Sequence, residues 1–173
     1  MKKPICICLC AVIALSLTAC FPNKYPIKEP GDDKQTSHQV ESDETFGLNE
    51  TAAFSKLKFT ATEIVESDGE GFFAPESGNV YVGVKFVVEN ISDDNQSVSS
   101  LMLFQGYVDN VKCPYSFNAN CVFDEGTLDG TLAPGKSLVG WYAMEVPKNW
   151  SCIELQVQSS IISNNPAKFV FNK

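Results

Sequence analysis

The chain has 173 residues, with 13 lysines, no arginine and 21 acidic residues, and its formal net charge is −8 at pH 7. An acidic surface repels phosphate backbones, and arginine is the side chain best suited to bidentate contacts with phosphate and guanine. These counts argue against a nucleic-acid partner. They make a basic partner or divalent cations electrostatically easier to bind.

The N-terminus has the layout of a bacterial secretory signal. Lys2 and Lys3 precede an apolar run that is shorter than the roughly 20 residues of a transmembrane helix, and polar, proline-containing sequence follows it. The run ends in Leu-Thr-Ala-Cys at Cys20, which resembles the lipobox of bacterial lipoproteins. This resemblance implies cleavage before Cys20 and a diacylglyceryl group on its thiol. An ordinary signal peptide that leaves a free protein is the alternative.

Two acyl chains hold a protein stably on a bilayer, whereas one chain binds only marginally. We therefore expect residues 1–19 to be a lipoprotein signal peptide. The membrane would be a partner of the chain through the anchor on Cys20, at the extracytoplasmic side of a bacterial cell membrane. Without Lys2 and Lys3, 11 lysines remain against 21 acidic residues, a net charge of −10.

Residues 20–47 are expected to be the lipidated cysteine and a disordered tether. Three prolines, two glycines and scattered polar residues lie here without an apolar period, a composition that does not form a packed core. The one histidine of the chain, His38, is in this stretch. The sequence that follows therefore offers no histidine for catalysis or metal binding.

Residues 48–173 are enough for one domain with its own core. Apolar and polar residues alternate along several runs, as they do in half-buried strands. The expected strands are residues 56–62, 80–90, 101–108, 136–146, 151–157 and 168–171, with 111–123 as one more strand that a cysteine loop interrupts. Turn-forming clusters separate these runs, and no window of ten or more residues has a clear helical period.

The alternation also predicts which side of each strand is buried. The residues expected in the core are Leu57, Phe59, Ala61, Val80, Val82, Val84, Phe86 and Val88. Tyr81, Lys85 and Glu89 are expected to face outward. In the 136–146 strand, Trp141 falls on the face opposite to Tyr142 and is also expected to be exposed.

Short strands at this spacing predict an all-β fold, an immunoglobulin-like β-sandwich of about seven strands. A closed barrel is the alternative. The strand Val84–Asn90, the Leu-x-Pro-Gly turn at 132–135 and a strand that closes on Val146-Pro147 resemble a bacterial domain family of unknown function. That family occurs on secreted proteins and lipoproteins. The resemblance spans roughly residues 48–172 and implies an immunoglobulin-like sandwich without an established activity.

The stretch GTLAPGKS, from Gly130 to Ser137, fits the phosphate-loop pattern. Such a loop needs a helix after it, whose N-terminal amides hold the phosphates. The residues after Ser137 include β-branched and aromatic side chains and a glycine, and they end in a proline, which predicts a strand instead. We therefore expect a β-turn at 133–136, in which Gly135 supplies a positive φ, and neither a nucleotide nor another cofactor.

No catalytic residues are predicted, because the domain lacks the histidine of His-assisted hydrolases. Asp93, Asp94 and Asp109 lie on expected turns and are weak candidates for a calcium site built from oxygen ligands. Solvated turns are the alternative interpretation, because the layout of the helical calcium loop is missing. No other metal site is expected.

Three cysteines lie beyond the expected anchor, so at least one of them stays unpaired or pairs between molecules. Cys113 and Cys121 bracket a short loop, and a disulfide between them is the first hypothesis, with all three thiols reduced as the alternative. Trp141, Tyr81 and Tyr107 are candidates for an aromatic ligand-binding surface. Packing in the core or at an edge is the more common role of such side chains.

Two functions are consistent with this sequence. The first is a non-enzymatic, membrane-anchored binding or interaction module that binds an unknown protein, envelope polymer or small ligand. The alternative is an envelope-acting enzyme, or an accessory subunit of one, that uses carboxylates which the sequence does not identify. A resemblance of fold does not by itself decide between them.

Overall fold

The structure is a computed structural model, and it describes residues 37–39, 44–161 and 165–173. The expected signal peptide, Cys20 and most of the expected tether lie outside the described residues. Among the residues that are described, no helix is both long enough and apolar enough to cross a membrane.

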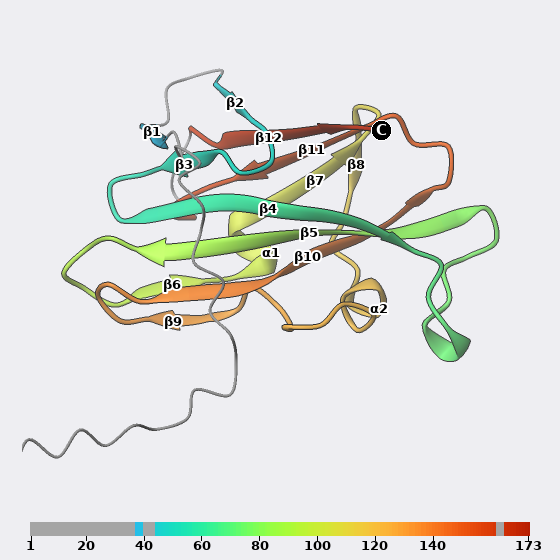
Figure 1. Cartoon of the computed structure of the whole chain (residues 1–173), viewed down its shortest axis with the longest axis horizontal. Helices are drawn as coiled ribbons and strands as arrows, with labels where there is room; N and C mark the ends of the chain where they lie inside the picture. The colour runs from blue at the N-terminus through green and yellow to red at the C-terminus, as the bar shows by residue number, and fades with distance from the viewer. Residues whose placement is uncertain (1–36, 40–43, 162–164) are drawn as a thin grey trace, which may run out of the picture. The chain divides into compact units, whose positions relative to one another are not determined.

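The described residues form two five-stranded sheets and one two-stranded sheet, whose arrangement can be followed in Figure 1. Sheet A has the order β1 (Ser37–Gln39), β3 (Thr51–Ala53), β4 (Leu57–Ser67), β5 (Asn79–Asn90) and β10 (Ser137–Pro147). Sheet B has the order β2 (Thr45–Phe46), β12 (Ala167–Asn172), β11 (Cys152–Val157), β7 (Phe104–Val108) and β8 (Val111–Cys113). The small sheet pairs β6 (Gln96–Val98) with β9 (Gly130–Leu132). The short helices are η1 (Gly71–Phe73), α1 (Ser100–Leu103) and α2 (Phe117–Asn120).

Strand β5 is antiparallel to both of its neighbours, β4 and β10. At one end of this trio Asn90 is opposite Leu57, and the adjacent Glu89 is opposite Ser137. We call this the Asn90 end. At the other end the β4–β5 turn spans residues 68–78, and we call it the hairpin end.

The core lies between the inner faces of the two sheets. Phe86 of sheet A contacts Phe104 and Phe169 of sheet B edge to face, with ring centroids 5.2 and 5.1 Å apart. Such contacts add about 0.5–1.5 kcal/mol each to the area that the rings bury. All eight side chains that the alternation places in the core are buried, which confirms this part of the prediction.

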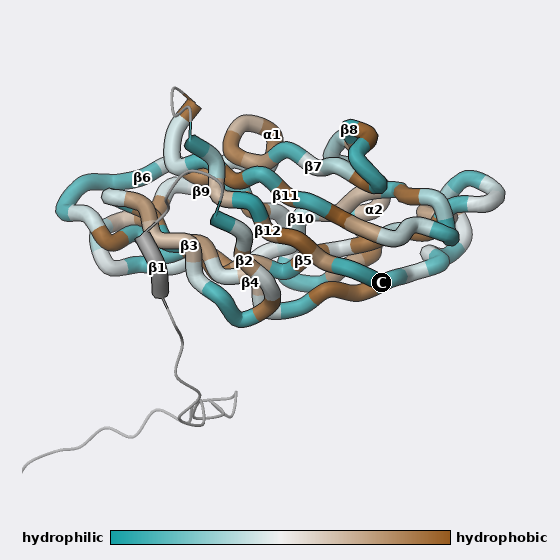
Figure 2. Tube along the Cα trace, turned by 90° about the horizontal axis from the view of Figure 1, so that it is seen from above, coloured by the Kyte–Doolittle hydropathy of each residue, from teal (hydrophilic) through white to brown (hydrophobic). Residues whose placement is uncertain are grey.

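The fold is a β-sandwich, as expected, but its described residues contain more strands than the predicted seven. The immunoglobulin-like arrangement stays a prediction. The expected strand 101–108 begins with α1, and the expected strand 111–123 is replaced by β8 and α2. Figure 2 shows α1 as a hydrophobic turn, and its Leu101 and Met102 are exposed.

The folded part begins earlier than the expected boundary at residue 48. Phe46 of β2 is buried in the core and its ring lies 5.4 Å from that of Phe169. Strand β1 pairs in parallel with β3. A tether without apolar periodicity still contains short segments that add to a sheet edge, because backbone hydrogen bonds depend little on side-chain pattern.

The GTLAPGKS stretch forms the expected β-turn. The Lys136 amide donates to the Ala133 carbonyl over 3.1 Å, and Gly135 has φ of 68°. Strand β10 begins directly afterwards at Ser137. The glycine is therefore required by the turn geometry, since a left-handed φ is strained for other residues.

Candidate functional site

Residues 114–128, between β8 and β9, run along the free edge of β10, and we call them the cover segment. Ala119, Val122 and Phe123 lie against the outer face of sheet A, whereas Tyr115 and Leu128 pack in the main core.

The Ser116 amide donates to the Ala143 carbonyl over 2.8 Å, and the Trp141 amide donates to the Gly126 carbonyl over 3.0 Å. Thr127 also forms an isolated parallel bridge with Trp141. An uncovered strand edge would offer unpaired backbone groups to other chains, and the cover segment pairs those of β10.

A second, smaller hydrophobic cluster forms beneath the cover segment. Tyr81, Ala119 and Ala143 are buried in it, and Val122 and Phe123 pack against them. Two of these residues, Tyr81 and Ala143, lie on the outer face of sheet A, where the alternation predicts exposed side chains.

Gly83 makes room for the cover segment. A Cβ atom at Gly83 would lie 2.8 Å from the nearest atom of the Phe123 ring, which is closer than real side chains approach. The absence of a side chain lets the ring rest on the β5 backbone. The cover segment also holds Tyr115 Oη and Asn120 Oδ1, two buried polar atoms that have no hydrogen-bond partner among the described residues.

Trp141 lies in a closed environment at the edge of this cluster. Its ring stacks on Phe123 with centroids 4.9 Å apart, and Lys85 Nζ lies 5.2 Å from the ring centroid. The indole N–H donates to Glu125 Oε2 over 3.0 Å, and Lys85 forms an ion pair of 2.9 Å with Glu125. The hydrogen bond with Lys85 lowers the pKa of Glu125, and the same bond raises the pKa of Lys85.

The expected exposure of Tyr81 and Trp141 is therefore wrong. Both lie on the outer face of sheet A, as the alternation requires, but their exposed fractions are 1% and 5%. The cover segment, which has no periodic pattern of its own, buries them. Neither ring is available to a ligand unless the cover segment moves.

Tyr107, the third aromatic candidate, is half-buried in sheet B. It lines a shallow cavity of about 280 Å³ together with Asn110, Cys152, Glu154 and Gln156. Tyr107 is thus the least buried of the three aromatic candidates.

The structure does not bring the three calcium candidates together. Asp93 and Asp94 follow β5 at the Asn90 end, whereas the Asp109 carboxylate accepts the Ser151 and Cys152 amides beyond the far end of β10. Strand β10 has 11 residues, so the two positions are separated by roughly 30 Å. Among the described residues no group of three His, Cys, Asp or Glu side chains could hold a metal ion.

The structure leaves Cys113, Cys121 and Cys152 unpaired, so the expected bond between Cys113 and Cys121 is not formed. Cys113 is half-buried, with its Sγ 3.4 Å from the Glu145 carbonyl oxygen, whereas Cys121 is exposed at the end of α2. Burial raises the pKa of the Cys113 thiol, and the charge of Glu145 raises it further. The two thiols thus occupy different environments on either side of Tyr115.

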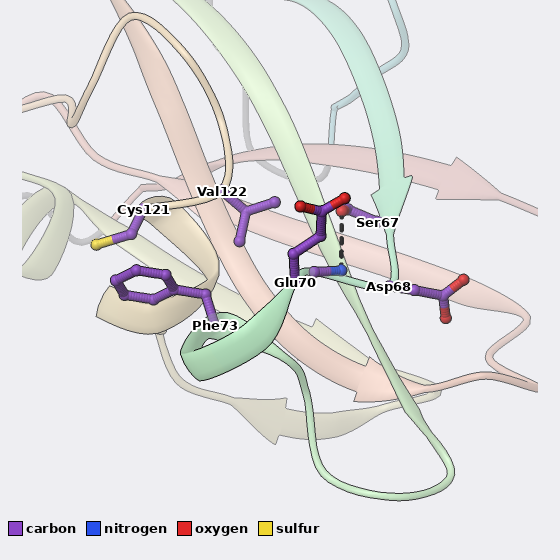
Figure 3. Close-up of a pocket in the computed structure, with 7 residues that line it drawn as sticks. Ser67, Asp68, Glu70, Phe73, Cys121 and Val122 are labelled. Atoms are coloured by element: carbon purple, nitrogen blue, oxygen red, sulfur yellow. Dashed lines mark hydrogen bonds between the residues drawn. The ribbon is translucent and has the colours of Figure 1, made fainter.

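The strongest candidate site is a pocket of about 410 Å³ between the β4–β5 hairpin and the cover segment (Figure 3). It is lined by Ser67, Asp68, Gly69, Glu70, Phe73, Cys121 and Val122. Figure 1 shows η1 and α2 next to each other beyond the strands of sheet A. The hairpin supplies the acidic side chains and one aromatic ring, and the cover segment supplies the opposite wall.

Glycines shape the hairpin side of the pocket. Gly69 and Gly71 have φ of 61° and 56°, and a Cβ atom at Gly69 would collide with the Phe73 carbonyl oxygen at 1.9 Å. The Gly69 amide donates to Ser67 Oγ over 3.1 Å. These contacts close the turn and bring η1 over the pocket, with Phe72 fully exposed beside it.

The two carboxylates of the pocket differ in what they bind. Asp68 forms an exposed ion pair of 2.7 Å with Lys148, and Figure 3 shows its side chain turned away from Phe73. Glu70 extends along the Val122 side of the pocket in the same view. Within the part of the chain that the structure describes, no side chain forms an ion pair or hydrogen bond with the Glu70 carboxylate.

Glu70 and Phe73 are not among the site residues that the sequence predicts. Glu70 lies in a glycine-containing turn cluster after the first expected strand, but a turn pattern does not say what lies opposite. The two consecutive phenylalanines after Gly71, outside any alternating run, are the signal that could have found the site. Exposed aromatic side chains on a glycine-rich hairpin are seldom explained by core packing.

A family model described as a domain of unknown function, DUF4352, matches residues 46–168. No curated protein has a significant match to the chain. Among solved structures, the chain is similar to a Bacillus subtilis protein described as a putative lipoprotein, with TM-score 0.57 and 16% identity. That match covers 70% of this chain and 38% of the other, so the chain spans well under half of that protein.

Two further structures have the same fold over most of their own length. A conserved hypothetical protein from Bacillus anthracis matches with TM-score 0.55 and 18% identity, covering 71% of this chain and 94% of the other. A secreted protein from Mycobacterium tuberculosis, MPT63, matches with TM-score 0.52 and 10% identity, covering 75% and 96%. At these identities the likeness concerns the fold.

Proposed function

We propose a function for this chain from the premise that it belongs to DUF4352, a family of domains of unknown function whose model spans residues 46–168. The chain is a lipid-anchored, extracytoplasmic module with an immunoglobulin-like sandwich, and it binds its partner non-enzymatically. The anchor is the diacylglyceryl group on Cys20. The lipobox resemblance supports the anchor, as does the fold shared with structures described as lipoproteins or secreted proteins.

The observation that carries the binding role is the exposed aromatic hairpin beside the pocket. Phe72 is fully exposed and Phe73 is 44% exposed, next to a cavity that is large enough for several side chains. Exposing two adjacent phenylalanines to water costs free energy that burial against a partner would recover, at about 25 cal/mol per Å². Aromatic side chains in well-packed pockets commonly dominate the energy of protein interfaces.

Position-specific photo-crosslinking of the full-length chain in living cells tests this function. A photo-reactive phenylalanine analogue replaces Phe72 at the hairpin end, and Leu101, an exposed residue of α1 at the other end of the sandwich, serves as the matched control position. We expect a discrete crosslinked species from position 72 that position 101 does not give. The same species from both positions, or none from position 72, would contradict the proposal.

An envelope-acting enzyme or accessory subunit is the second candidate, which the two carboxylates in one pocket favour. In that case the full-length chain would release products from purified cell-wall polymer. The Glu70→Gln substitution would abolish that release while leaving the fold intact, because the Glu70 carboxylate makes no contact that holds the hairpin.

A further inference from the structure

The outer face of sheet B, unlike that of sheet A, is accessible along its strands. The outward-facing residues of β7, β11 and β12 are all at least partly exposed, whereas the inward-facing residues between them are buried. In β5 of sheet A, by contrast, the consecutive residues 80–84 are all buried, because both faces of that strand are covered there. Another molecule can therefore reach the outer side chains of sheet B directly.

Tyr107 is the aromatic side chain on this face. It lies on β7 directly opposite Glu154 of β11, and Gln105 lies opposite Gln156 one step along the face. Side chains directly opposite each other have Cβ atoms about 4.5–5.5 Å apart, and Tyr107, Glu154 and Gln156 line one cavity of about 280 Å³. Among the described residues, the Tyr107 ring contacts no other ring and its hydroxyl group has no hydrogen-bond partner. The ring is thus available for a contact that the described part of the chain does not supply.

The polar groups beside the ring are joined by one hydrogen bond. Gln156 Nε2 donates to Glu154 Oε1 over 2.8 Å. This bond leaves Glu154 Oε2 and Gln156 Oε1 without a partner among the described residues. An oxygen of either kind accepts hydrogen bonds from O–H and N–H groups. The cavity therefore combines an aromatic ring with two acceptor oxygens whose side chains hold each other in place.

This combination matches the two kinds of surface on a pyranose sugar. The C–H groups on one face of a sugar ring pack against the negative face of an aromatic ring. The hydroxyl and acetamido groups at its edge donate hydrogen bonds, and a carboxylate is the strongest acceptor for them. The cavity is slightly smaller than the roughly 300–1,000 Å³ of pockets that enclose drug-sized ligands. It therefore fits one sugar unit while the rest of a chain continues over the open face.

The charges around Tyr107 favour an uncharged ligand. Glu154 lies opposite Tyr107 on one side and Lys112 of β8 on the other, so a carboxylate and an ammonium group flank the ring. The whole chain has a net charge of −8, which repels polymers that carry phosphate. An extended peptide would gain few backbone hydrogen bonds here, because the backbone at Tyr107 is paired on both sides. A neutral sugar chain meets none of these obstacles.

We propose that the outer face of sheet B binds the glycan strands of the bacterial cell wall, whose sugar units are N-acetylated and uncharged. One sugar ring stacks on Tyr107, and its hydroxyl or acetamido group donates to Glu154 or Gln156. This inference goes beyond the proposed function, since it assigns a polymer to sheet B, whereas the partner proposed above binds at the hairpin of sheet A. The two proposals share the extracytoplasmic location as a premise.

Sedimentation of the full-length chain, in detergent micelles, with purified insoluble cell wall tests this inference. The wall is first stripped of its phosphate-containing polymers. We expect the chain to sediment with the wall and to be released by the soluble tetramer of N-acetylglucosamine. Tyr107→Ala should weaken binding at least about tenfold, whereas Tyr107→Phe, which keeps the ring, should stay within about twofold of the unsubstituted chain. Glu154→Gln should weaken binding severalfold, because a charged acceptor is lost.

Phe72→Ala is the matched control, because it also removes an exposed aromatic ring, but at the hairpin end. It should leave binding to the wall unchanged. Melting temperatures of the variants check that each one is folded, and Glu154→Gln decides the outcome if Tyr107→Ala is not. Tyr107→Ala should also leave the crosslinked species from position 72 unchanged, so that the failure of one proposal is distinguishable from the failure of the other.

Three results would overturn the inference. The first is an unsubstituted chain that does not sediment with the wall. The second is binding that Tyr107→Ala and Glu154→Gln leave unaltered, or that Phe72→Ala weakens as much as they do. The third is release by soluble peptides cut from the same wall and not by the sugar tetramer, which would identify a peptide as the ligand.

Discussion

The two faces of sheet A are buried by different means. The inner face packs against sheet B through side chains that recur at every second position from Leu57 to Ala61 of β4 and from Val80 to Val88 of β5, and each of these side chains is buried. The outer face is covered in part by one irregular segment, whose contacts depend on a single glycine, one aromatic stack and a few backbone hydrogen bonds. Burial of the inner face follows from the alternation of side chains along each strand. Burial of the outer face depends on where one loop folds.

This difference has a functional consequence, because the cover segment is also one wall of the candidate pocket. Cys121 and Val122, which line the pocket, directly precede Phe123, whose ring rests on Gly83. The inner face should therefore determine whether the protein folds. The outer face should determine whether the pocket exists.

The largest expected effect is on the inner face. Replacing Phe86 by Ala removes a fully buried ring that contacts two others, and it should lower the free energy of unfolding by about 3–5 kcal/mol. Chemical denaturation of the full-length chain measures this. Val139→Ala on β10, where the side chain is 40% exposed, is the control and should change stability by less than about 0.5 kcal/mol. Equal losses from both variants would contradict the account of the core.

A smaller effect is expected from overpacking the outer face. Gly83→Val should displace the Phe123 ring and cost about 1–3 kcal/mol, less than the loss at Phe86. It should also increase the accessibility of Trp141 to a soluble fluorescence quencher, measured with Trp150 replaced by Phe. Gly130→Ala is the control, since a Cβ atom there meets nothing within 4 Å. Unchanged quenching of Trp141 in the Gly83→Val variant would show that the Phe123 ring does not rest on Gly83.

A still smaller effect on stability is expected when the pH is lowered. The pKa of Glu125 is lowered by its hydrogen bond to Lys85, and that of Glu66 is lowered by its hydrogen bond to Lys173. A folded-state pKa below the ordinary value of 4.5 means that this stabilisation is fully present above pH 4.5 and is lost as the pH falls through the folded value. Melting temperatures between pH 7 and pH 3 should show this loss. Glu125→Gln should flatten part of the dependence, and an unaltered slope would refute the assignment.

The smallest effect on stability is expected at the cysteines, whose thiols should differ in their rates of alkylation. Exposed Cys121 should react with iodoacetamide first, and Cys113 should react last, because its thiol is half-buried and its pKa is raised by burial. Peptide mapping after short labelling times gives the order. A disulfide between Cys113 and Cys121, the first hypothesis from the sequence, would make both thiols resistant to alkylation until a reductant is added. That result would contradict the unpaired arrangement of these two cysteines.

The inner face was predictable because one rule determines it. Alternation from Val80 to Val88 specifies a strand and its buried side, and a proline and a glycine at 134–135 specify the turn before β10. The outer face follows no such rule. Nothing in the sequence around Tyr81 or Trp141 says that residues 114–128 fold back over them, because the covering residues lie 16 and 18 residues away from Trp141 and about 40 residues away from Tyr81.

The candidate pocket could not be predicted for the same reason, because its two walls come from segments that are far apart in the sequence. Its acidic and aromatic residues come from one hairpin and could be seen as a glycine-rich turn followed by two phenylalanines. Its other wall comes from the end of α2, in a stretch where the sequence favoured a strand interrupted by a cysteine loop. A four-residue helix is too short to have a recognisable period, so α2 could be found only in three dimensions.

The central claim is that the cover segment is folded onto sheet A and thereby builds the pocket. Hydrogen exchange at single-residue resolution tests it most directly, through the Ser116 and Trp141 amides that join the cover segment to β10. We expect both amides to be protected in the unsubstituted chain and to exchange much faster in Gly83→Val, while the amides of β5 stay protected. Exchange of both amides at the rate of an unstructured chain in the unsubstituted protein would contradict the claim.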